Sequence, residues 1–538
     1  MELTRDGLRD REKWDKLGIS LPRYDIGQVA ERTLEQPTWV HFGAGNIFRG
    51  FISELQQRLL NLGSSQTGIV AVESFDYEII DKIYRPYDNL SLLVLMHPDG
   101  TLQKTVVGSI AAGIRADSSS EEEWSRLKNI FRSPSLQMVS FTITEKGYSL
   151  KDVHGTYLPV VKSDLENGPA RPKHVMAIVA SLAYERYCAG QLPVAFVSMD
   201  NCSHNGEKLF RSVLEIVNAW KEKGLVPEEF ASYLQNEKKV AFPWTMIDKI
   251  TPRPSETVRK SLEKDGIRRL APVITEKRTF IAPFVNAEVP QYLVVEDTFP
   301  NGRPPLEKAG VYFTDRETVN KTERMKVTTC LNPLHTALAI YGCLLGFSSI
   351  SSEMQDPQLK KLVEKIGYDE GMPVVITPGI LNPDDFIHEV IDKRLPNRFI
   401  PDTPQRIATD TSQKIAIRFG ETIKSYRDRP DLDPAGLVFI PLALAGWLRY
   451  LLGVDDEGKA MEISADPMLS TLQQSLGKIR LGDKGPFHSA LQPILANPVL
   501  FGVNLYEVGL GNKVEGYFAE LVAGPHAVRS TLEKYLAD

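Results

Sequence analysis

The first clear change of hydrophobic period lies near the N-terminus. A short apolar run, PTWVHF at 37–42, predicts a β-strand that leads into the turn Gly43-Ala44-Gly45. Apolar residues then recur at helical spacing as far as Leu60, and Gly63 stands where a helix C-cap belongs. A second apolar run, 68–72, ends in the acidic Glu73. This order of strand, glycine turn, helix and strand predicts a βαβ unit.

Strand and helix patterns continue to alternate up to about residue 304 and then give way to helices. Strands are predicted at 91–96, 137–144, 194–198 and 292–295, and helices between them at 177–187 and 208–223. Further on, helices are predicted at 333–345, 358–366, 412–426, 437–452 and 525–536. The turn-forming PNGRPP at 300–305 separates the two patterns. We therefore expect an α/β Rossmann-like domain with a mostly parallel sheet over 1–304, and a mainly α-helical domain over 305–538.

Composition and charge narrow the class of function. The chain has 538 residues, 42% of them hydrophobic and 25% charged, which is typical of a globular protein with more than one domain. A net charge of -6 gives no electrostatic reason to expect nucleic acid as a partner, so a small-molecule substrate is favoured. The charged N-terminus does not resemble a secretory signal, and no apolar run reaches the about 20 residues that span a bilayer. Four cysteines without a CxxC pair fit a reducing compartment. We expect a cytoplasmic protein without a membrane partner.

The glycine turn is the candidate nucleotide site. The segment GAGNIF has the first two glycines of a GxGxxG fingerprint, but Phe48 takes the place of the third. Gly43 permits a tight turn, and Gly45 lets a pyrophosphate approach the N–H groups at the helix start, which begins with Asn46 and Ile47. GxG turns also occur without a ligand, and here the surrounding βαβ pattern favours a dinucleotide.

Acidic residues at the end of the second strand bear on the choice of dinucleotide. Glu73, and secondarily Asp76, lie where a carboxylate would accept hydrogen bonds from ribose hydroxyls. A carboxylate there would repel a 2′-phosphate, so NAD is favoured over NADP. The alternative is a solvated acid at a strand end, which explains Asp76 equally well.

A cluster of polar residues precedes one of the most apolar helices. Glu323, Lys326, Asn332 and His335 occur within thirteen positions. Asn332 followed by Pro333 is a good helix N-cap and first-turn pair, which accounts for both residues without catalysis. A lone histidine in a first helical turn is also more often structural than catalytic.

These residues resemble the signature of the polyol-specific long-chain dehydrogenase/reductases, the mannitol dehydrogenase family. The family signature is a lysine, then an asparagine, then a histidine three residues later. Further blocks agree in order along the chain: FGAGNIFRGF, TEKGY at 144–148, MDNCSHNG at 199–206, FPWTMIDKITP at 242–252 and VVEDTFPNGRPPLEKAGV at 294–311. One departure is the spacing from Lys326 to Asn332, which is six residues where the family usually has five. A one-residue bulge in the loop, or another group in place of the lysine, would explain it.

The resemblance implies a metal-free hydride transfer with Lys326 as general acid/base. A lysine serves if burial or a nearby cation lowers its pKa toward neutrality. By resemblance, Asn201 and Asn332 stabilise the alkoxide as amide donors and His335 orients the substrate oxygen. Asp200 and Asp248 are candidates to bind substrate hydroxyls or to hold the lysine, although Asp248 beside Lys249 fits a structural ion pair equally well. No metal is expected, because Cys330 and His335 are two potential ligands without a third.

The resemblance also implies a substrate class. The length of the chain and the segment DTPQRIATDTSQK at 402–414 favour interconversion of D-fructuronate and D-mannonate with NAD, with tagaturonate reduction or mannitol oxidation as the alternatives. Arg398 and Arg406 are candidates to bind the carboxylate of a sugar acid. A monomer or small homo-oligomer is expected. The irregular spacing after Lys326 leaves open a different class, a nucleotide-binding sensor without catalysis.

Overall fold

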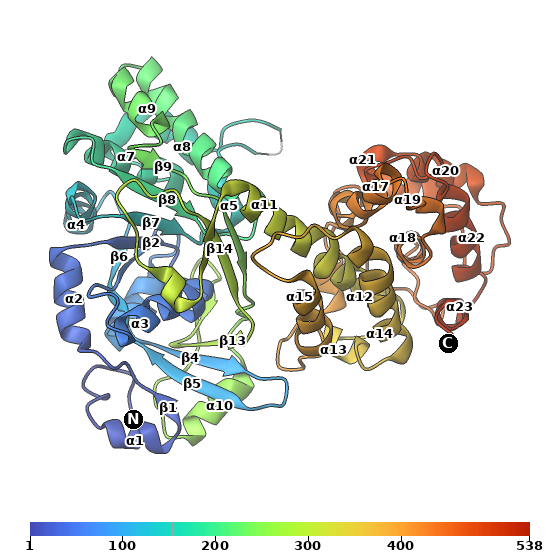
Figure 1. Ribbon diagram of the computed structural model, residues 1–538, viewed down its shortest axis with the longest axis horizontal. Helices are drawn as coiled ribbons and strands as arrows, with labels where there is room; N and C mark the ends of the chain where they lie inside the picture. Colours follow the sequence, from blue (N-terminus) through green and yellow to red (C-terminus); the bar gives the residue numbers. More distant parts are fainter. Residues whose placement is uncertain (153, 538) are drawn as a thin grey trace. The chain divides into compact units, whose positions relative to one another are not determined.

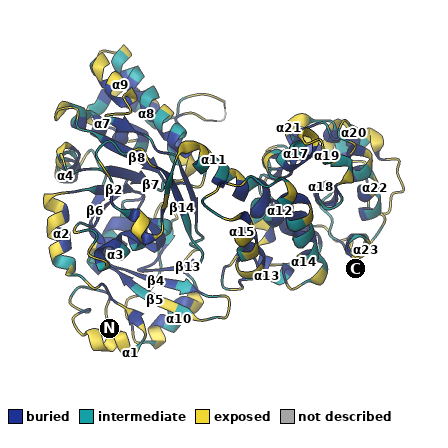
Figure 2. Ribbon diagram, in the orientation of Figure 1, coloured by how far each residue is buried: buried dark blue, intermediate teal, exposed yellow. Residues whose placement is uncertain are grey.

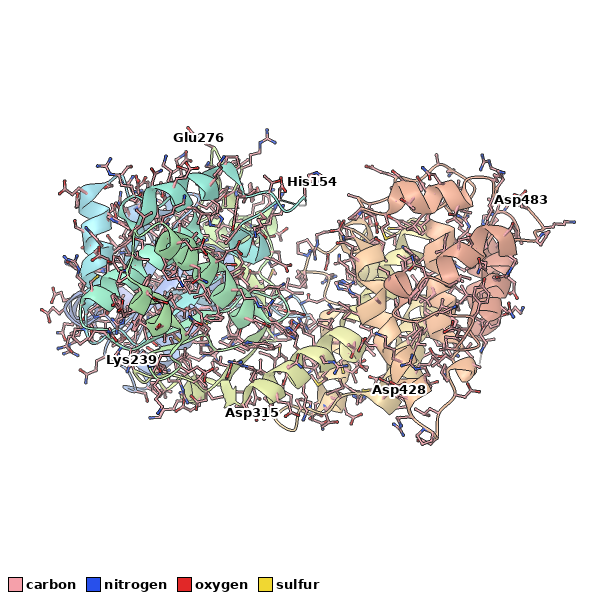
Figure 3. All side chains as sticks on the ribbon, turned by 90° about the horizontal axis from the view of Figure 1, so that it is seen from above. His154, Lys239, Glu276, Asp315, Asp428 and Asp483 are labelled. Carbon is pink, nitrogen blue, oxygen red and sulfur yellow. The ribbon has the colours of Figure 1, made fainter. Side chains whose placement is uncertain are left out.

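The computed structural model describes residues 1–152 and 154–537. The chain divides into two compact units, Met1–Asn320 and Lys321–Asp538. All fifteen strands that the structure describes belong to the first unit, and the second unit is built of helices (Figure 1). Charged side chains such as Glu276, Asp428 and Asp483 project outward from the ribbon (Figure 3).

A six-stranded parallel sheet forms the centre of the first unit, in the order β6-β3-β2-β7-β8-β9. Its strands are β2 Trp39–Phe42, β3 Ile69–Glu73, β6 Ile110–Arg115, β7 Met138–Phe141, β8 Val194–Ser198 and β9 Val240–Ala241. The order reverses at β2, because β3 and β6 extend to one side of it and β7 to β9 to the other. This is the doubly wound Rossmann arrangement, so the predicted fold class of the N-terminal domain is confirmed.

Both faces of this sheet are buried, which explains why its strands are mostly apolar (Figure 2). Val40 and Phe42 belong to one hydrophobic core and Trp39 to the other, as the strand period of two requires. The first core includes residues of α4 Glu121–Arg132, α7 Val175–Cys188, α8 Asn205–Glu222 and α9 Glu228–Gln235. The second includes the π-helical turn η1 Phe48–Ile52 and α3 Ser53–Asn61. The unit also contains α1 Arg11–Lys16, α2 Ile26–Glu35, α5 Thr144–Tyr148, α6 Pro159–Asn167 and α10 Glu256–Lys264.

Two of the predicted strands lie outside the parallel sheet. β4 (Ser91–Met96) pairs antiparallel with β5 (Leu102–Val107), and β14 (Tyr292–Glu296) pairs antiparallel with β10 (Thr245–Asp248). A tight turn at Asp99-Gly100 joins β4 to β5, and a hairpin needs no crossover helix, so alternation with helices does not apply to this pair. The strands β10 and β14 are instead joined by a long connection that contains α10. The remaining strands are β1 Ile19–Ser20, β11 Val273–Ile274, β12 Phe280–Ile281, β13 Phe284–Glu288 and β15 Tyr312–Thr314.

The first unit continues beyond the boundary that the sequence predicts after residue 304. The 3-10 turn η5 (Leu306–Ala309) buries Leu306 and Ala309 in the same core as β2, and β15 pairs with β14. The turn-rich PNGRPP segment therefore lies inside the first unit. The composition of this segment indicates a turn, but β15, the last strand of the unit, follows the turn and pairs with β14.

The second unit is helical, as predicted for the C-terminal part of the chain. Its most buried helices are α12 (Asn332–Leu344) and α18 (Phe439–Tyr450), which pack on each other. Around them lie α13 Ile350–Glu353, α14 Pro357–Glu364, α15 Pro383–Glu389, α16 Pro404–Ile407, α17 Glu421–Asp428, α19 Leu469–Leu476, α20 His488–Leu495, α21 Pro498–Phe501, α22 Gly511–Leu521 and α23 Ala527–Tyr535. The two most apolar stretches of the sequence thus form the core of this unit.

The helix predicted over 412–426 is broken into three pieces. A 3-10 turn η10 (Thr411–Gln413) and a π-helical turn η11 (Ala416–Gly420) precede α17. A Cβ at Gly420 would lie 2.1 Å from the carbonyl oxygen of Phe501, so the chain passes directly against another backbone segment here. Gly420 is itself helical, with φ -61° and ψ -36°, and η11 runs directly into α17, so the break in the predicted helix lies between η10 and η11.

Candidate active site

The turn after β2 contains two glycines, Gly43 and Gly45, whose surroundings differ. Gly43 has φ +103°, and a Cβ there would lie 2.1 Å from the carbonyl oxygen of Thr142, which follows β7. At Gly45 a Cβ would meet nothing within 4 Å. Packing therefore does not require Gly45, and the open space beside it leaves room for a pyrophosphate to approach the N–H groups at the helix start, Asn46 and Ile47. The turn fits a dinucleotide at the switch point of the sheet.

Phe48 occupies the position of the third glycine. Its ring stacks on His41 of β2 with the centroids 4.2 Å apart. A ring of this size keeps the helix away from the strand, and the helix opens with the π-helical turn η1. The helix is closely packed at Gly50 instead, where a Cβ would be 2.7 Å from Cγ1 of Val285.

Glu73 ties the end of β3 to the glycine turn. Its Oε2 accepts the N–H of Ala44 at 2.9 Å, and its Oε1 accepts the N–H groups of Ser74, Phe75 and Asp76 at 3.0, 2.9 and 3.2 Å. Burial raises the pKa of the Glu73 carboxyl, and the backbone N–H bonds oppose that rise. Oε2 accepts one of these bonds and has capacity for a second donor, such as a ribose hydroxyl.

Asp76 is equally enclosed. Its Oδ2 accepts the hydroxyl of Thr275 at 2.6 Å, from the turn between β11 and β12. Glu73 is 6% exposed and Asp76 only 2%. Neither residue is therefore a solvated acid at a strand end.

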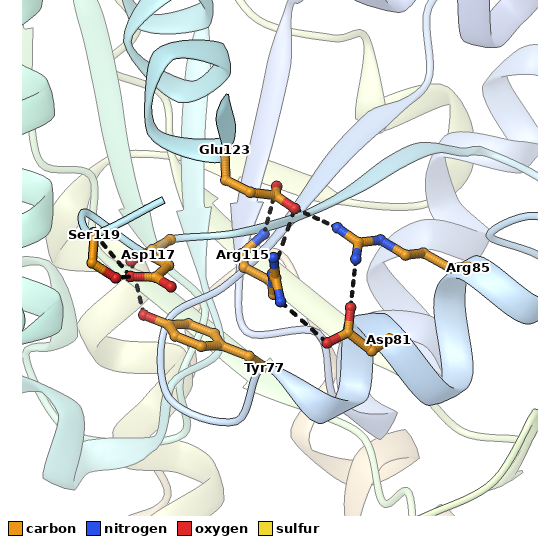
Figure 4. Close-up of polar contacts among 8 residues, drawn as sticks. Tyr77, Asp81, Arg85, Arg115, Asp117, Ser119 and Glu123 are labelled. Carbon is orange, nitrogen blue, oxygen red and sulfur yellow. Dashed lines mark hydrogen bonds and ion pairs between the residues drawn. The ribbon is translucent and has the colours of Figure 1, made fainter. Parts of the chain in front are cut away.

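A network of ion pairs supports this edge of the sheet (Figure 4). Arg115, at the end of β6, is the register partner of Glu73 and lies 3.3 Å from the carboxylate of Asp81. Glu123, almost fully buried at the start of α4, pairs with both Arg85 and Arg115. These cross-links connect β6, the helical turns after β3 and α4. They hold the carboxyl edge next to Glu73 in place.

The residues after β8 reach the same carboxyl edge. The carboxylate of Asp200 accepts the N–H groups of Ile143 and Thr144 at 3.0 and 2.8 Å and the hydroxyl of Tyr148 at 2.6 Å. Burial raises the pKa of Asp200, and these bonds oppose the rise. Asp200 thus anchors the segment after β7. The neighbouring Asn201 is exposed.

Asp248 lies at the end of β10, outside the parallel sheet, and is 7% exposed. The ammonium of the adjacent Lys249 donates to the backbone oxygen of Glu288 at 2.5 Å and to Oε1 of Gln291 at 3.1 Å. These bonds link the end of β10 to the connection between β13 and β14.

Lys326 opens a π-helical turn, η6 (Lys326–Cys330), between α11 (Arg316–Met325) and α12. The N–H of Leu331 donates to the Lys326 carbonyl at 3.1 Å, the i to i+5 bond of a π-helix. The lysine is 1% exposed. Because a π turn takes one residue more than an α turn, it accommodates the extra residue between Lys326 and Asn332. The bulge expected from the spacing is present in the backbone.

Asn332 is not the N-cap of α12, contrary to the sequence-based interpretation. It is the first residue of the helix, Pro333 is the second, and Leu331 takes the cap position without any side-chain cap bond. The chain enters α12 directly from η6, so there is no extended residue at Asn332 to cap the helix. The carbonyl of Asn332 accepts the hydroxyl of Thr336 at 2.8 Å. Capping therefore does not explain this asparagine.

His335 is held by a carboxylate from a distant loop. Its Nε2 lies 3.2 Å from Oδ2 of Asp402, and Oδ1 of Asp402 accepts a bond from Nε of Arg406 at 2.8 Å. Burial lowers the pKa of His335, opposed by Asp402. Burial alone would raise the pKa of Asp402, but His335 and Arg406 bring it below its usual value. The structure thus places His335 and Arg406 on the same carboxylate.

Arg398 stands apart from this group. It is exposed, with its guanidinium carbon 4.9 Å from the centroid of the Phe399 ring. Its contact is a surface cation–π interaction.

Sequence reasoning missed Arg418 and Glu353, which interact electrostatically with the His335–Asp402 pair, and Lys414, whose pKa is lowered in part by Arg418 and Arg406. Burial is the main cause of the lowered pKa of His335, and the positive charge of Arg418 lowers that pKa further. Glu353, 0% exposed, has both carboxyl oxygens without a hydrogen-bond partner, and burial followed by the charge of Asp402 raises its pKa to about 9. The basic segment around 406–418 was a usable signal for the two cations, whereas nothing local distinguishes Glu353.

Within 1–152 and 154–537, no three or more His, Cys, Asp or Glu side chains gather in a way that could hold a metal ion. Over the same residues, no helix combines the length and the apolarity needed to cross a bilayer.

Comparisons with known proteins bear on the whole chain. Residues 37–308 match the family model of the mannitol dehydrogenase Rossmann domain, and residues 318–505 match that of the mannitol dehydrogenase C-terminal domain. A D-mannonate oxidoreductase of Thermotoga maritima is 56% identical over 99% of this chain and 99% of its own. A mannitol 2-dehydrogenase of Neosartorya fischeri is 29% identical over 90% of both chains.

Solved structures agree with this. A substrate-free D-sorbitol dehydrogenase superposes with a TM-score of 0.78 at 26% identity, covering 95% of this chain and 97% of the other. The ternary complex of Pseudomonas fluorescens mannitol 2-dehydrogenase with NAD and D-mannitol gives a TM-score of 0.72 at 26% identity, covering 100% and 99%. With both domain models matched in order and relatives aligned end to end, the chain belongs to the mannitol dehydrogenase family.

Proposed function

We propose that this protein is an NAD-dependent oxidoreductase that interconverts D-mannonate and D-fructuronate. The observation that carries the proposal is the 56% identity over 99% of both chains to a D-mannonate oxidoreductase. The open backbone at Gly45 and the carboxylate of Glu73 beside it support a dinucleotide with a free ribose 2′-hydroxyl.

Lys326 is the proposed general acid/base. When NAD is bound it supplies the acceptor for the hydride that leaves the substrate carbon. The hydroxyl proton of the same carbon goes to the Lys326 amine in oxidation and returns from its ammonium in reduction. Near-complete burial of Lys326 keeps bulk water from exchanging that proton.

Fixed polar groups complete the proposed mechanism. The side-chain amide of Asn332 donates to the oxygen on which negative charge develops, without adding net charge. His335 donates to or accepts from the same oxygen, and Asp402 holds its ring in orientation through Nε2. The first-turn position of Asn332, free of a capping role, supports its assignment as a donor.

Oxidation of NADH with three keto substrates tests the proposal. Initial rates are measured with D-fructuronate, D-tagaturonate and D-fructose, and kcat/KM is expected to be highest for fructuronate. A higher kcat/KM with fructose would instead assign a polyol dehydrogenase, and with tagaturonate the epimeric uronate reductase. Tight NADH binding without turnover of any of the three would indicate a nucleotide-binding sensor.

A further inference from the structure

Arg418 is attached to the same helical turn that carries Asn332 and His335. It lies in the π-helical turn η11, and its Nη1 donates to Oγ1 of Thr336 at 2.5 Å. The Thr336 hydroxyl in turn donates to the carbonyl of Asn332. The guanidinium is therefore held beside the first turn of α12 by a side chain adjacent to His335.

The guanidinium of Arg418 lacks a carboxylate partner among the residues that the structure describes. Over the same residues, its one hydrogen bond goes to Thr336. Burial lowers the pKa of its guanidinium to about 10. A half-buried guanidinium with five N–H donors and one neutral partner is costly unless an anion completes the site.

Other cations surround it. Burial lowers the pKa of Lys414, and the nearby charge of Arg418 lowers it further. The carboxylates of Asp410 and Asp466 oppose this lowering. Arg406 contributes to the same lowering, but its own charge is balanced by Asp402. At His335, the charges of Arg418 and Arg406 act against the single carboxylate of Asp402.

We propose that Arg418 binds the carboxylate of the substrate and is the residue that selects sugar acids over neutral polyols. This inference rests on the proposed function, in which His335 contacts the reacting oxygen. A six-carbon sugar acid carries its carboxylate a few bonds from that oxygen, and Thr336 holds the guanidinium one residue from His335. A guanidinium can bind a carboxylate through two parallel N–H bonds, a geometry that a hydroxymethyl group cannot match. Arg398 is committed to the Phe399 ring and Arg406 to Asp402, so Arg418 is the better candidate.

Calorimetric titration of the NADH-loaded protein tests the assignment without turnover. D-mannonate and D-mannitol, which differ only by carboxylate against hydroxymethyl, are the two ligands. In Arg418→Gln the Kd of D-mannonate is expected to rise by about 10- to 100-fold, the loss of charge-assisted bonds, while that of D-mannitol stays within about twofold. Arg418→Lys, which keeps a point charge, should give an intermediate rise. Arg427→Gln, which removes an exposed arginine paired with Asp428, is the matched control and should change neither.

An equal rise in the Kd of both ligands, or an unchanged Kd for D-mannonate, would overturn the assignment. Thermal denaturation verifies that Arg418→Gln is folded; if it is not, the selective effect on D-mannonate is required of Arg418→Lys. The proposed function is judged separately from fructuronate turnover by the unaltered protein. If the unaltered protein turns over fructuronate but Arg418→Gln binds D-mannonate normally, the proposed function stands and the role of Arg418 fails. If Arg418→Gln selectively loses D-mannonate binding but the unaltered protein does not turn over fructuronate, the role of Arg418 stands and the proposed function fails.

Discussion

Lys326 is the residue on which the proposed chemistry depends. Replacing it with alanine should lower kcat by about 10²- to 10⁴-fold, the usual contribution of a positioned general acid/base, because the hydroxyl proton loses its acceptor. The Kd of NADH, measured by fluorescence titration, should change little, since the nucleotide-binding turn lies in the first unit. Lys459→Ala, at an exposed surface lysine, is the control. Near-normal kcat in Lys326→Ala would mean that another group transfers the proton.

The buried carboxyl group of Glu353 should make the free energy of unfolding depend on pH. Its pKa is about 9 in the folded protein because it is buried, against 4.5 for an ordinary glutamate. Between these values the unfolded chain has released the proton and the folded protein has kept it. The unfolding free energy therefore falls as pH rises, by up to about 1.4 kcal/mol per pH unit from this group.

Glu353→Gln removes this titration and should make the protein more stable than the unaltered chain, by a margin that grows from pH 6 to pH 8. Urea unfolding at three pH values measures it. Glu457→Gln, at an exposed glutamate, should show no such growing margin. A constant difference across pH would show that Glu353 does not hold a proton in the folded state.

At the scale of elements, the βαβ unit predicts cofactor preference. The Glu73 carboxylate beside the glycine turn should repel a 2′-phosphate, so NADH should bind at least about tenfold more tightly than NADPH. In Glu73→Gln the charge is gone and the ratio of the two Kd values should shrink. Fluorescence titrations of both nucleotides give the ratio, with Glu78→Gln on the following helical turn as control. An unchanged ratio would remove Glu73 from this role.

The length of the π-helical turn η6 should affect turnover. Six residues across a π turn bring Asn332 close to the orientation that five residues give across an α turn, the usual spacing of the family. Deleting Thr329 should therefore convert the turn to an α turn and keep kcat within about tenfold. Inserting an alanine after Thr328 should reduce kcat far more, because a helix cannot absorb a second extra residue in the same turn. If the deletion abolishes turnover in a folded protein, η6 does more than accommodate the spacing.

At the scale of the whole molecule, the boundary between the units can be tested with fragments. Residues 1–320 should fold and bind NADH without catalysing turnover, because they form a compact unit with its own core. Residues 1–304 lack β15 and the buried Leu306 and Ala309, and should melt at a lower temperature. Thermal denaturation and NADH titration of both fragments provide the comparison. Equal stability would place the boundary where composition alone suggests it.

Local order in the sequence was sufficient for the nucleotide-binding half of the fold. The strand at 37–42, the glycine turn and the helix to Leu60 are encoded by neighbouring residues, whose period changes from two to 3.6 at the turn. Glu73 was located in the same way, as the end of an apolar run. The one-residue excess after Lys326 was also visible, because spacing within a single turn is a local property.

What only the tertiary structure decided depends on residues far apart in the chain. Asp402 orients His335 from 67 positions away, and the backbone of Phe501 passes directly against Gly420. The carboxylate of Glu73 is bonded by Ala44 across the sheet edge, and Arg418 reaches Thr336 across 82 positions. Such contacts leave no periodic trace, because a hydrogen bond or a clash between distant segments constrains two positions and not the pattern between them. The sequence by itself determined the family and the nucleotide-binding unit, and the folded chain determined which distant charged side chains pair with one another.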